Sequence, residues 1–97
     1  MYIICAKLPS YERYVMINQM TRAAISVPSN LAEGQQRTDK EFNNFIRIAR
    51  GSLSELKVQL EICKRLYPDI DNDTAMNMID EIGKMTYGLM LRLKADN

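Results

Sequence analysis

The chain contains 97 residues, of which 46% are hydrophobic and 26% are charged, and its formal net charge is +1. This composition is typical of an ordinary globular protein, so we expect a single domain over residues 1–97. The sequence has no histidine, which removes the commonest general base and metal ligand, and it has no apolar run near the ~20 residues that a membrane span requires.

The first residues form a short apolar segment, 2–7, which is followed by Leu8 and Pro9. A residue that precedes a proline disfavours helical geometry, so the segment is expected to end there. No basic stretch precedes it and no small-residue cleavage site follows it, which argues against a signal peptide. Cys5 and Cys63 lie far apart and form no C-x-x-C motif, as expected of thiols in a reducing compartment. We therefore predict a cytoplasmic protein without a membrane partner.

Residues 10–34 are predicted to form the first long helix, which ends at Gly34. Apolar residues recur there at steps of three and four, the spacing of one helical stripe: Ile17, Met20, Ala24, Val27 and Leu31. Pro28 lies inside this helix, where a proline loses a hydrogen bond and clashes with the preceding turn. The helix therefore either breaks or kinks at Pro28. Because the apolar phase continues through the proline without a slip, we expect a kink.

The first long helix also carries a polar wedge about 80° wide that, at 100° per residue, is predicted to lie opposite its apolar stripe. The wedge consists of Gln19, Arg22, Ser26, Asn30 and Glu33, with Ala23 beside it. A solvated face is the commoner outcome for such a wedge. Short polar residues compete for backbone hydrogen bonds and are unusual on solvated helix faces, so we predict that the wedge is a subunit interface.

Residues 39–67 are predicted to form the second long helix, with Pro68 after it. Thr38 and Glu41 have the spacing of a capping box, in which each side chain satisfies a backbone N–H of the other residue. Gly51 in the middle of the helix is expected to allow close approach of another helix. The apolar stripe is the longest in the chain and consists of Phe42, Phe45, Ala49, Leu53, Leu56, Leu60, Cys63 and Tyr67.

The second long helix also carries a row of cations along one flank of its apolar stripe, which we call the basic flank. It consists of Lys40, Arg47, Arg50, Lys57, Lys64 and Arg65, and Arg37 in the preceding loop would extend it. Charge is uneven along the chain, at +4 over residues 1–67 and −3 over residues 68–97. Three interpretations follow: a solvated face, contact with nucleic-acid phosphates, or contact with an acidic flank of another copy in a closed ring.

Residues 69–73, DIDND, begin like a calcium-binding loop, but Thr74 stands where such a loop needs glycine. A solvated turn is expected there, with Asp73 or Thr74 as the cap of a last helix over 74–94. The apolar stripe of this helix uses Ala75, Met78 or Ile79, Ile82, Met85 or Thr86, Leu89 and Leu93. Since no segment alternates like a strand and the connections are short, the predicted fold class is an all-α, antiparallel up-down helical bundle.

Three stretches of the sequence resemble one protein family: LPSYE (8–12), QMTRAAISVPSNLAEGQQR (19–37) and EFNNFIRIARGSLSELKVQLE (41–61), with EIGKM (81–85) a weaker match. They are similar to the bacterial four helix bundle proteins, also called 23S rRNA intervening-sequence proteins. The resemblance implies a homo-oligomeric ring, a pentamer. It also implies a relationship to the accessory protein of diversity-generating retroelements, which binds nucleic acid and a reverse transcriptase.

The resemblance also implies a full helix before the Leu8–Pro9 turn, of which residues 2–7 would be only a truncated end. Three long helices without that partner are expected to expose an apolar groove, which a neighbouring subunit would fill. Neither the resemblance nor the residues themselves indicate a catalytic residue, a metal site or a cofactor. We therefore predict a non-enzymatic oligomer that binds RNA, DNA or a ribonucleoprotein through its basic flank. The alternative is a protein-interaction scaffold whose charges serve only ring assembly.

Overall fold

The computed structural model describes residues 10–96, apart from the side chains at 10, 12, 13, 17, 95 and 96. It contains three long helices, α2 (Ser10–Gln35), α3 (Asp39–Leu66) and α4 (Asp73–Asp96), and no strand within this range. The predicted all-α class is confirmed, and each predicted helix lies within two residues of its observed bounds. The predicted N-terminal helix end, 2–7, lies outside the described residues.

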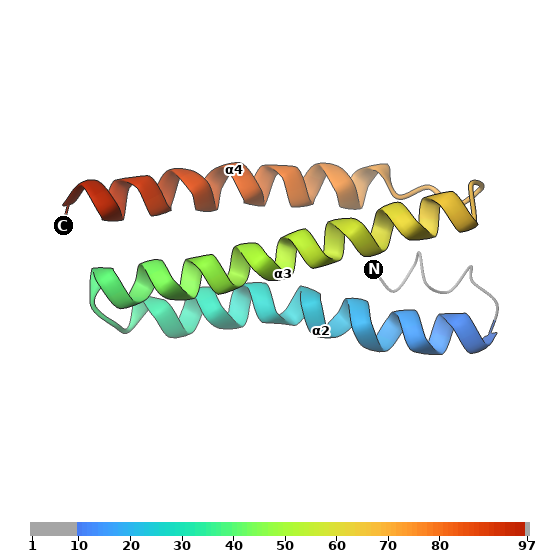
Figure 1. Cartoon of the computed structure of the whole chain (residues 1–97), viewed down its shortest axis with the longest axis horizontal. Helices are drawn as coiled ribbons and strands as arrows, with labels where there is room; N and C mark the ends of the chain where they lie inside the picture. Colours follow the sequence, from blue (N-terminus) through green and yellow to red (C-terminus); the bar gives the residue numbers. More distant parts are fainter. Residues whose placement is uncertain (1–9, 97) are drawn as a thin grey trace.

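The helices run antiparallel in an elongated array of 48 × 20 × 15 Å, with α3 between α2 and α4 (Figure 1). Helix α3 packs against both neighbours, whereas no Cα atom of α2 lies within 8 Å of one in α4. This is the expected result of short connections, which place consecutive helices side by side. Helices α2 and α4 therefore both pack against α3 but not against each other.

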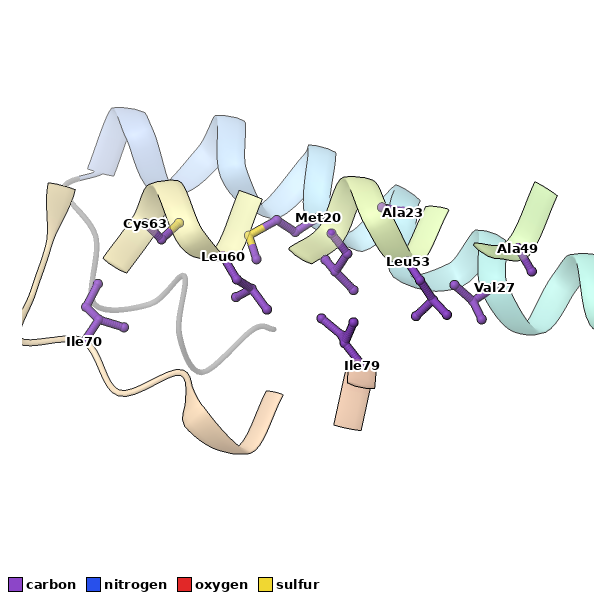
Figure 2. Packing of buried hydrophobic residues seen from close by; sticks show 10 residues of the cluster. Met20, Ala23, Val27, Ala49, Leu53, Leu60, Cys63, Ile70 and Ile79 are labelled. Carbon is purple, nitrogen blue, oxygen red and sulfur yellow. The ribbon is translucent and has the colours of Figure 1, made fainter. Parts of the chain in front are cut away.

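The core lies mainly between α2 and α3 and extends to α4 through Ile79 (Figure 2). It contains the predicted stripe of α3 from Ala49 to Cys63, together with Ile46, which the stripe omitted. The buried residues of α2 are Met20, Ala23 and Val27. Ala23, which was predicted to lie beside the polar wedge, is therefore part of the core.

Helix α2 continues through Pro28, so the alternative of a break is wrong. Gly34 also lies inside α2 rather than ending it, because the helix continues to Gln35. No glycine among the described residues has a positive φ. Gly34 is buried, and a Cβ atom built on it would lie 2.6 Å from Cδ1 of Phe42. Its role is close packing of the α2–α3 turn, not a left-handed cap.

Helix α3 begins with the predicted cap, although the capping box differs in detail. The Thr38 hydroxyl accepts a hydrogen bond from the backbone N–H of Glu41 at 3.2 Å. It also donates to the Glu41 carboxylate at 3.0 Å. The reciprocal bond of a capping box, in which a backbone N–H donates to the carboxylate, is therefore replaced by the bond from the Thr38 hydroxyl to the Glu41 carboxylate. The predicted close approach of another helix at Gly51 is not found within the described residues, because a Cβ atom there would meet nothing within 4 Å.

The α3–α4 connection is fastened by polar contacts to the end of α3. Asn72 is buried, and its side-chain amide donates to the carbonyl of Leu60 at 2.9 Å. Asp71 accepts from the backbone N–H of Asp73 at 3.0 Å, in the manner of an Asx turn. Because Asp73 and Thr74 already lie inside α4, the predicted cap at these positions is wrong by one or two residues.

An open apolar groove of about 1040 Å³ lies between α2 and α4. Its walls include Val27, Pro28, Leu31, Met78, Ile82 and Met85. Of the alternatives left open for α4, Ile79 and Thr86 are buried, whereas Met78 and Met85 are exposed on the groove wall. The groove predicted for three long helices is therefore present. None of the helices in the described part of the chain is long and apolar enough to cross a membrane.

Candidate nucleic-acid interface

Three cations of the basic flank point into solvent: Lys40, Arg47 and Arg65 are exposed on α3. None of the three side chains makes a hydrogen bond or an ion pair within residues 10–96. Lys40 and Arg47 are seven residues apart, which corresponds to roughly 10 Å along a helix. These three side chains keep their full capacity to bind an external anion.

The other two lysines of the basic flank, Lys57 and Lys64, make contacts within the chain. The ammonium group of Lys57 lies 3.4 Å from the carboxylate of Asp80 on α4, and both side chains remain about half exposed. The ammonium group of Lys64 donates to the carbonyls of Pro68 at 3.0 Å and Ile70 at 3.3 Å. Lys64 therefore satisfies backbone acceptors beyond the end of α3, a common arrangement for a lysine in the last turn.

Arg50 links α3 to α4. Its guanidinium donates to the carbonyl of Gly83 at 2.6 Å and to the hydroxyl of Thr86 at 3.0 Å. The same group lies 5.4 Å from the centre of the Tyr87 ring, within the range of a cation–π contact. The sequence did not identify Gly83, Thr86 or Tyr87 as partners of Arg50. These partners lie more than thirty positions further along the chain, and only the register between α3 and α4 brings them to Arg50.

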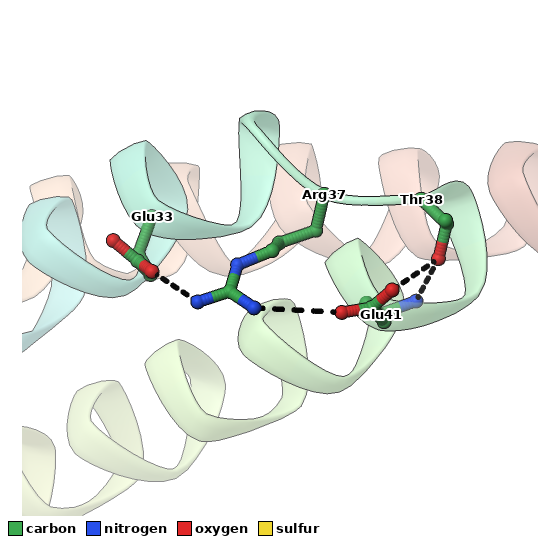
Figure 3. Close-up of polar contacts among 4 residues, drawn as sticks. All are labelled: Glu33, Arg37, Thr38 and Glu41. Atoms are coloured by element: carbon green, nitrogen blue, oxygen red, sulfur yellow. Dashed lines mark hydrogen bonds and ion pairs between the residues drawn. The ribbon is translucent and has the colours of Figure 1, made fainter.

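Arg37, predicted to extend the basic flank, bridges two carboxylates at the α2–α3 turn (Figure 3). Its guanidinium lies 2.6 Å from Glu33 and 3.6 Å from Glu41. The hydrogen bond to Glu33, followed by the charge of Glu33, raises the pKa of Arg37 above its usual value. The guanidinium also lies 5.6 Å from the centre of the Phe45 ring. Arg37 thus stabilises the α2–α3 turn by linking the two helices that it joins.

The polar wedge of α2 lies along the edge of α3 and not opposite the core. The hydroxyl of Ser52 on α3 donates to that of Ser26 at 2.8 Å. Asn30 donates to both the carbonyl and the hydroxyl of Ser26, at 2.8 and 3.0 Å. Arg22 forms an exposed ion pair with Glu55 of α3 at 3.4 Å. The predicted position opposite the core is therefore wrong, because the stripe that faces α3 passes through Ala23.

The wedge nevertheless keeps an outer edge that faces solvent. Gln19, Arg22 and Glu33 are exposed, whereas Ser26 and Asn30 are half-buried beside α3. Contact of these five residues with a second copy stays a prediction. Among the described residues, no three His, Cys, Asp or Glu side chains are grouped so that they could hold a metal ion.

The helices thus define an all-α antiparallel bundle protein with one basic flank and one open apolar groove. Residues 1–88 match the family model described as 23S rRNA-intervening sequence protein. The chain therefore belongs to this family, and the resemblance in the sequence is confirmed. Neither the curated proteins nor the solved structures contain a match to the chain.

Proposed function

We propose that this protein is a non-enzymatic, cytoplasmic RNA-binding component of a ribonucleoprotein, and that it contacts RNA through the basic flank of α3. The observation that supports this function is the exposure of Lys40, Arg47 and Arg65 without an internal anionic partner in the described part of the chain. Unpaired cations of this kind bind a polyphosphate with high affinity, because each phosphate that they neutralise releases condensed counterions into solution.

The family description links its members to intervening sequences of 23S rRNA. Structured RNA is therefore the first ligand to test for this chain. The sequence resemblance also suggests DNA as a ligand and a reverse transcriptase or another protein as a partner. A flank without a base-reading motif is expected to bind backbone phosphates with little sequence preference.

The test is a salt titration of binding to a fluorescent hairpin RNA, followed by anisotropy. We expect the affinity to fall steeply with salt concentration, and Arg47→Glu to weaken binding and reduce the salt slope by about 0.9, the loss of one phosphate contact. The matched control is Arg92→Glu, which makes the same charge change at the α2–α4 groove. If both variants weaken binding equally, the basic flank is not the RNA contact.

The groove between α2 and α4 favours a second function, that of a protein-interaction scaffold. A contiguous exposed apolar surface such as the wall of this groove is a feature of protein–protein interaction sites. A second copy is the partner that the resemblance implies, in a homo-oligomer that would be a pentameric ring. In this alternative the basic flank contacts an acidic flank of the next copy. Arg47→Glu would then dissociate the oligomer in sedimentation velocity, and RNA would not bind to the wild type.

A further inference from the structure

A second hollow, of about 430 Å³, opens between α3 and α4 and is continuous with the basic flank. Two of its lining residues, Arg50 and Lys57, belong to that flank, and Lys84 of α4 adds a third cation. Tyr87 also lines the hollow, and 49% of the residue is exposed. The hollow therefore combines positive charge with an accessible aromatic ring.

We propose that this hollow receives one unpaired nucleotide of a bound RNA, an inference that rests on the proposed RNA-binding function. Proteins that bind unpaired RNA stack bases on aromatic rings and on the planar guanidinium of arginine. The guanidinium of Arg50 already lies over the ring of Tyr87. Arg50 is held in place by the carbonyl of Gly83 and the hydroxyl of Thr86. A stacking surface that is fixed before binding loses little conformational freedom when the ligand arrives.

The charged groups around the hollow fit the remaining parts of a nucleotide. Lys57 and Lys84 supply ammonium groups for the phosphate. Asp80 supplies a carboxylate, which accepts hydrogen bonds from the N–H groups of a base. Since Lys57 and Asp80 are about half exposed and 3.4 Å apart, both can exchange their mutual contact for a ligand.

Gly83 offers a position at which the role of the hollow can be tested. It lines the hollow, and a Cβ atom built on it would meet nothing within 4 Å among the described residues. Gly51 and Gly88 are equally open, so the glycine by itself does not indicate a ligand. A methyl group at Gly83 adds volume at the wall of the hollow without a clash inside the chain.

Gly83→Ala therefore tests the proposal without weakening the fold, since alanine is the better helix former. We expect Gly83→Ala to weaken binding of a fluorescent unstructured oligoribonucleotide about tenfold, the effect of losing one base–aromatic contact. Tyr87→Ala should cause a similar loss, whereas Tyr87→Phe, which keeps the ring, should retain binding. A blunt RNA duplex, which offers no unpaired base, should bind all these variants like the wild type.

The matched control is Gly88→Ala, since Gly88 is also in α4 and open on its Cβ side but does not line the hollow. Thermal melting of each variant confirms that the fold is retained. If the oligoribonucleotide binds Gly83→Ala and wild type equally, the hollow is not the nucleotide site, although the basic flank still binds RNA. If neither RNA binds the wild type, the proposed function itself fails. Equal competition by polyglutamate would identify an acidic protein surface as the ligand and overturn the proposal.

Discussion

At the scale of single residues, the helical glycines of this chain serve different purposes. Gly34 lies against the aromatic rings at the start of α3, whereas Gly51 and Gly88 face open space. A glycine in an open helical position only lowers stability. A glycine in a tight contact allows close packing, which the side chain of any other residue would disrupt. The same substitution is therefore expected to have opposite effects at these positions.

Gly34→Ala is expected to lower the free energy of unfolding by about 1–3 kcal/mol, the usual cost of overpacking. The added Cβ atom would lie 2.6 Å from Cδ1 of Phe42 and 2.8 Å from Cβ of Phe45. The latter atom is next to the backbone and has little freedom to move. Urea denaturation followed by circular dichroism measures the change.

Gly51→Ala is the control for this prediction, because it makes the same chemical change in open space. It should raise the free energy of unfolding by roughly 0.5–1 kcal/mol, through the lower backbone entropy of alanine in the unfolded chain. An equal loss of stability in both variants would contradict the packing role of Gly34.

At the scale of helices, Pro28 is the main local conflict in the fold. A proline inside a helix costs ~3 kcal/mol or more, because one backbone hydrogen bond is lost and the ring meets the preceding turn. Helix α2 nevertheless continues to Gln35, since Val27 is buried just before the proline and Leu31 packs against the core after it. Tertiary packing on both sides thus outweighs the local preference to stop.

Pro28→Ala is therefore expected to raise the free energy of unfolding by about 2 kcal/mol. This figure is the cost of a proline inside a helix, reduced by the entropy that proline removes from the unfolded chain. The exposed position of Pro28 leaves room for the alanine side chain. Urea denaturation at low protein concentration is the measurement. Unchanged or lower stability would show that the proline ring makes a favourable contact.

The helices were predictable from sequence, whereas their mutual register was not. Thr38 and Pro68 mark the ends of α3, and the apolar phase identifies each helix, because these signals are local. Ala24 was predicted in the apolar stripe and packs partly against the core, whereas Ala23, predicted beside the polar wedge, is buried more fully. Two neighbouring alanines differ only in their direction around the helix, so their hydrophobicity does not show which one faces α3. The contacts of Arg50 with α4 were not accessible at all, since they depend on how the α3–α4 connection sets the register.

At the scale of the whole molecule, the array of three helices leaves the side between α2 and α4 open. Helix α3 is covered on two sides, whereas the facing sides of α2 and α4 are separated by the apolar groove. Met78 and Met85, on its α4 wall, are 56% and 69% exposed. A single exposed apolar side chain has little effect on the free energy of the protein. Burial of a continuous apolar wall, in contrast, stabilises the complex with the partner that covers it.

If a second copy covers the groove, as the scaffold alternative proposes, the double variant Met78→Glu/Met85→Glu should disrupt self-assembly and leave the three-helix fold intact. Two carboxylates in the groove would have to lose their hydration on contact with a partner, which is costly. In the isolated chain they would stay in water, because both positions are exposed. Sedimentation velocity should show a smaller species than the wild type, with an unchanged circular dichroism spectrum.

Leu91→Glu is the control, because Leu91 is 49% exposed on the same helix but does not line the groove. It adds a negative charge to α4 without placing it on the apolar wall, so the oligomer should persist. Loss of assembly in both cases would assign the effect to charge on α4 and not to the groove. A wild-type chain that sediments as a monomer over a wide concentration range would show that a second copy does not cover this surface, whereas concentration-dependent assembly blocked only by the groove variant would show that it does.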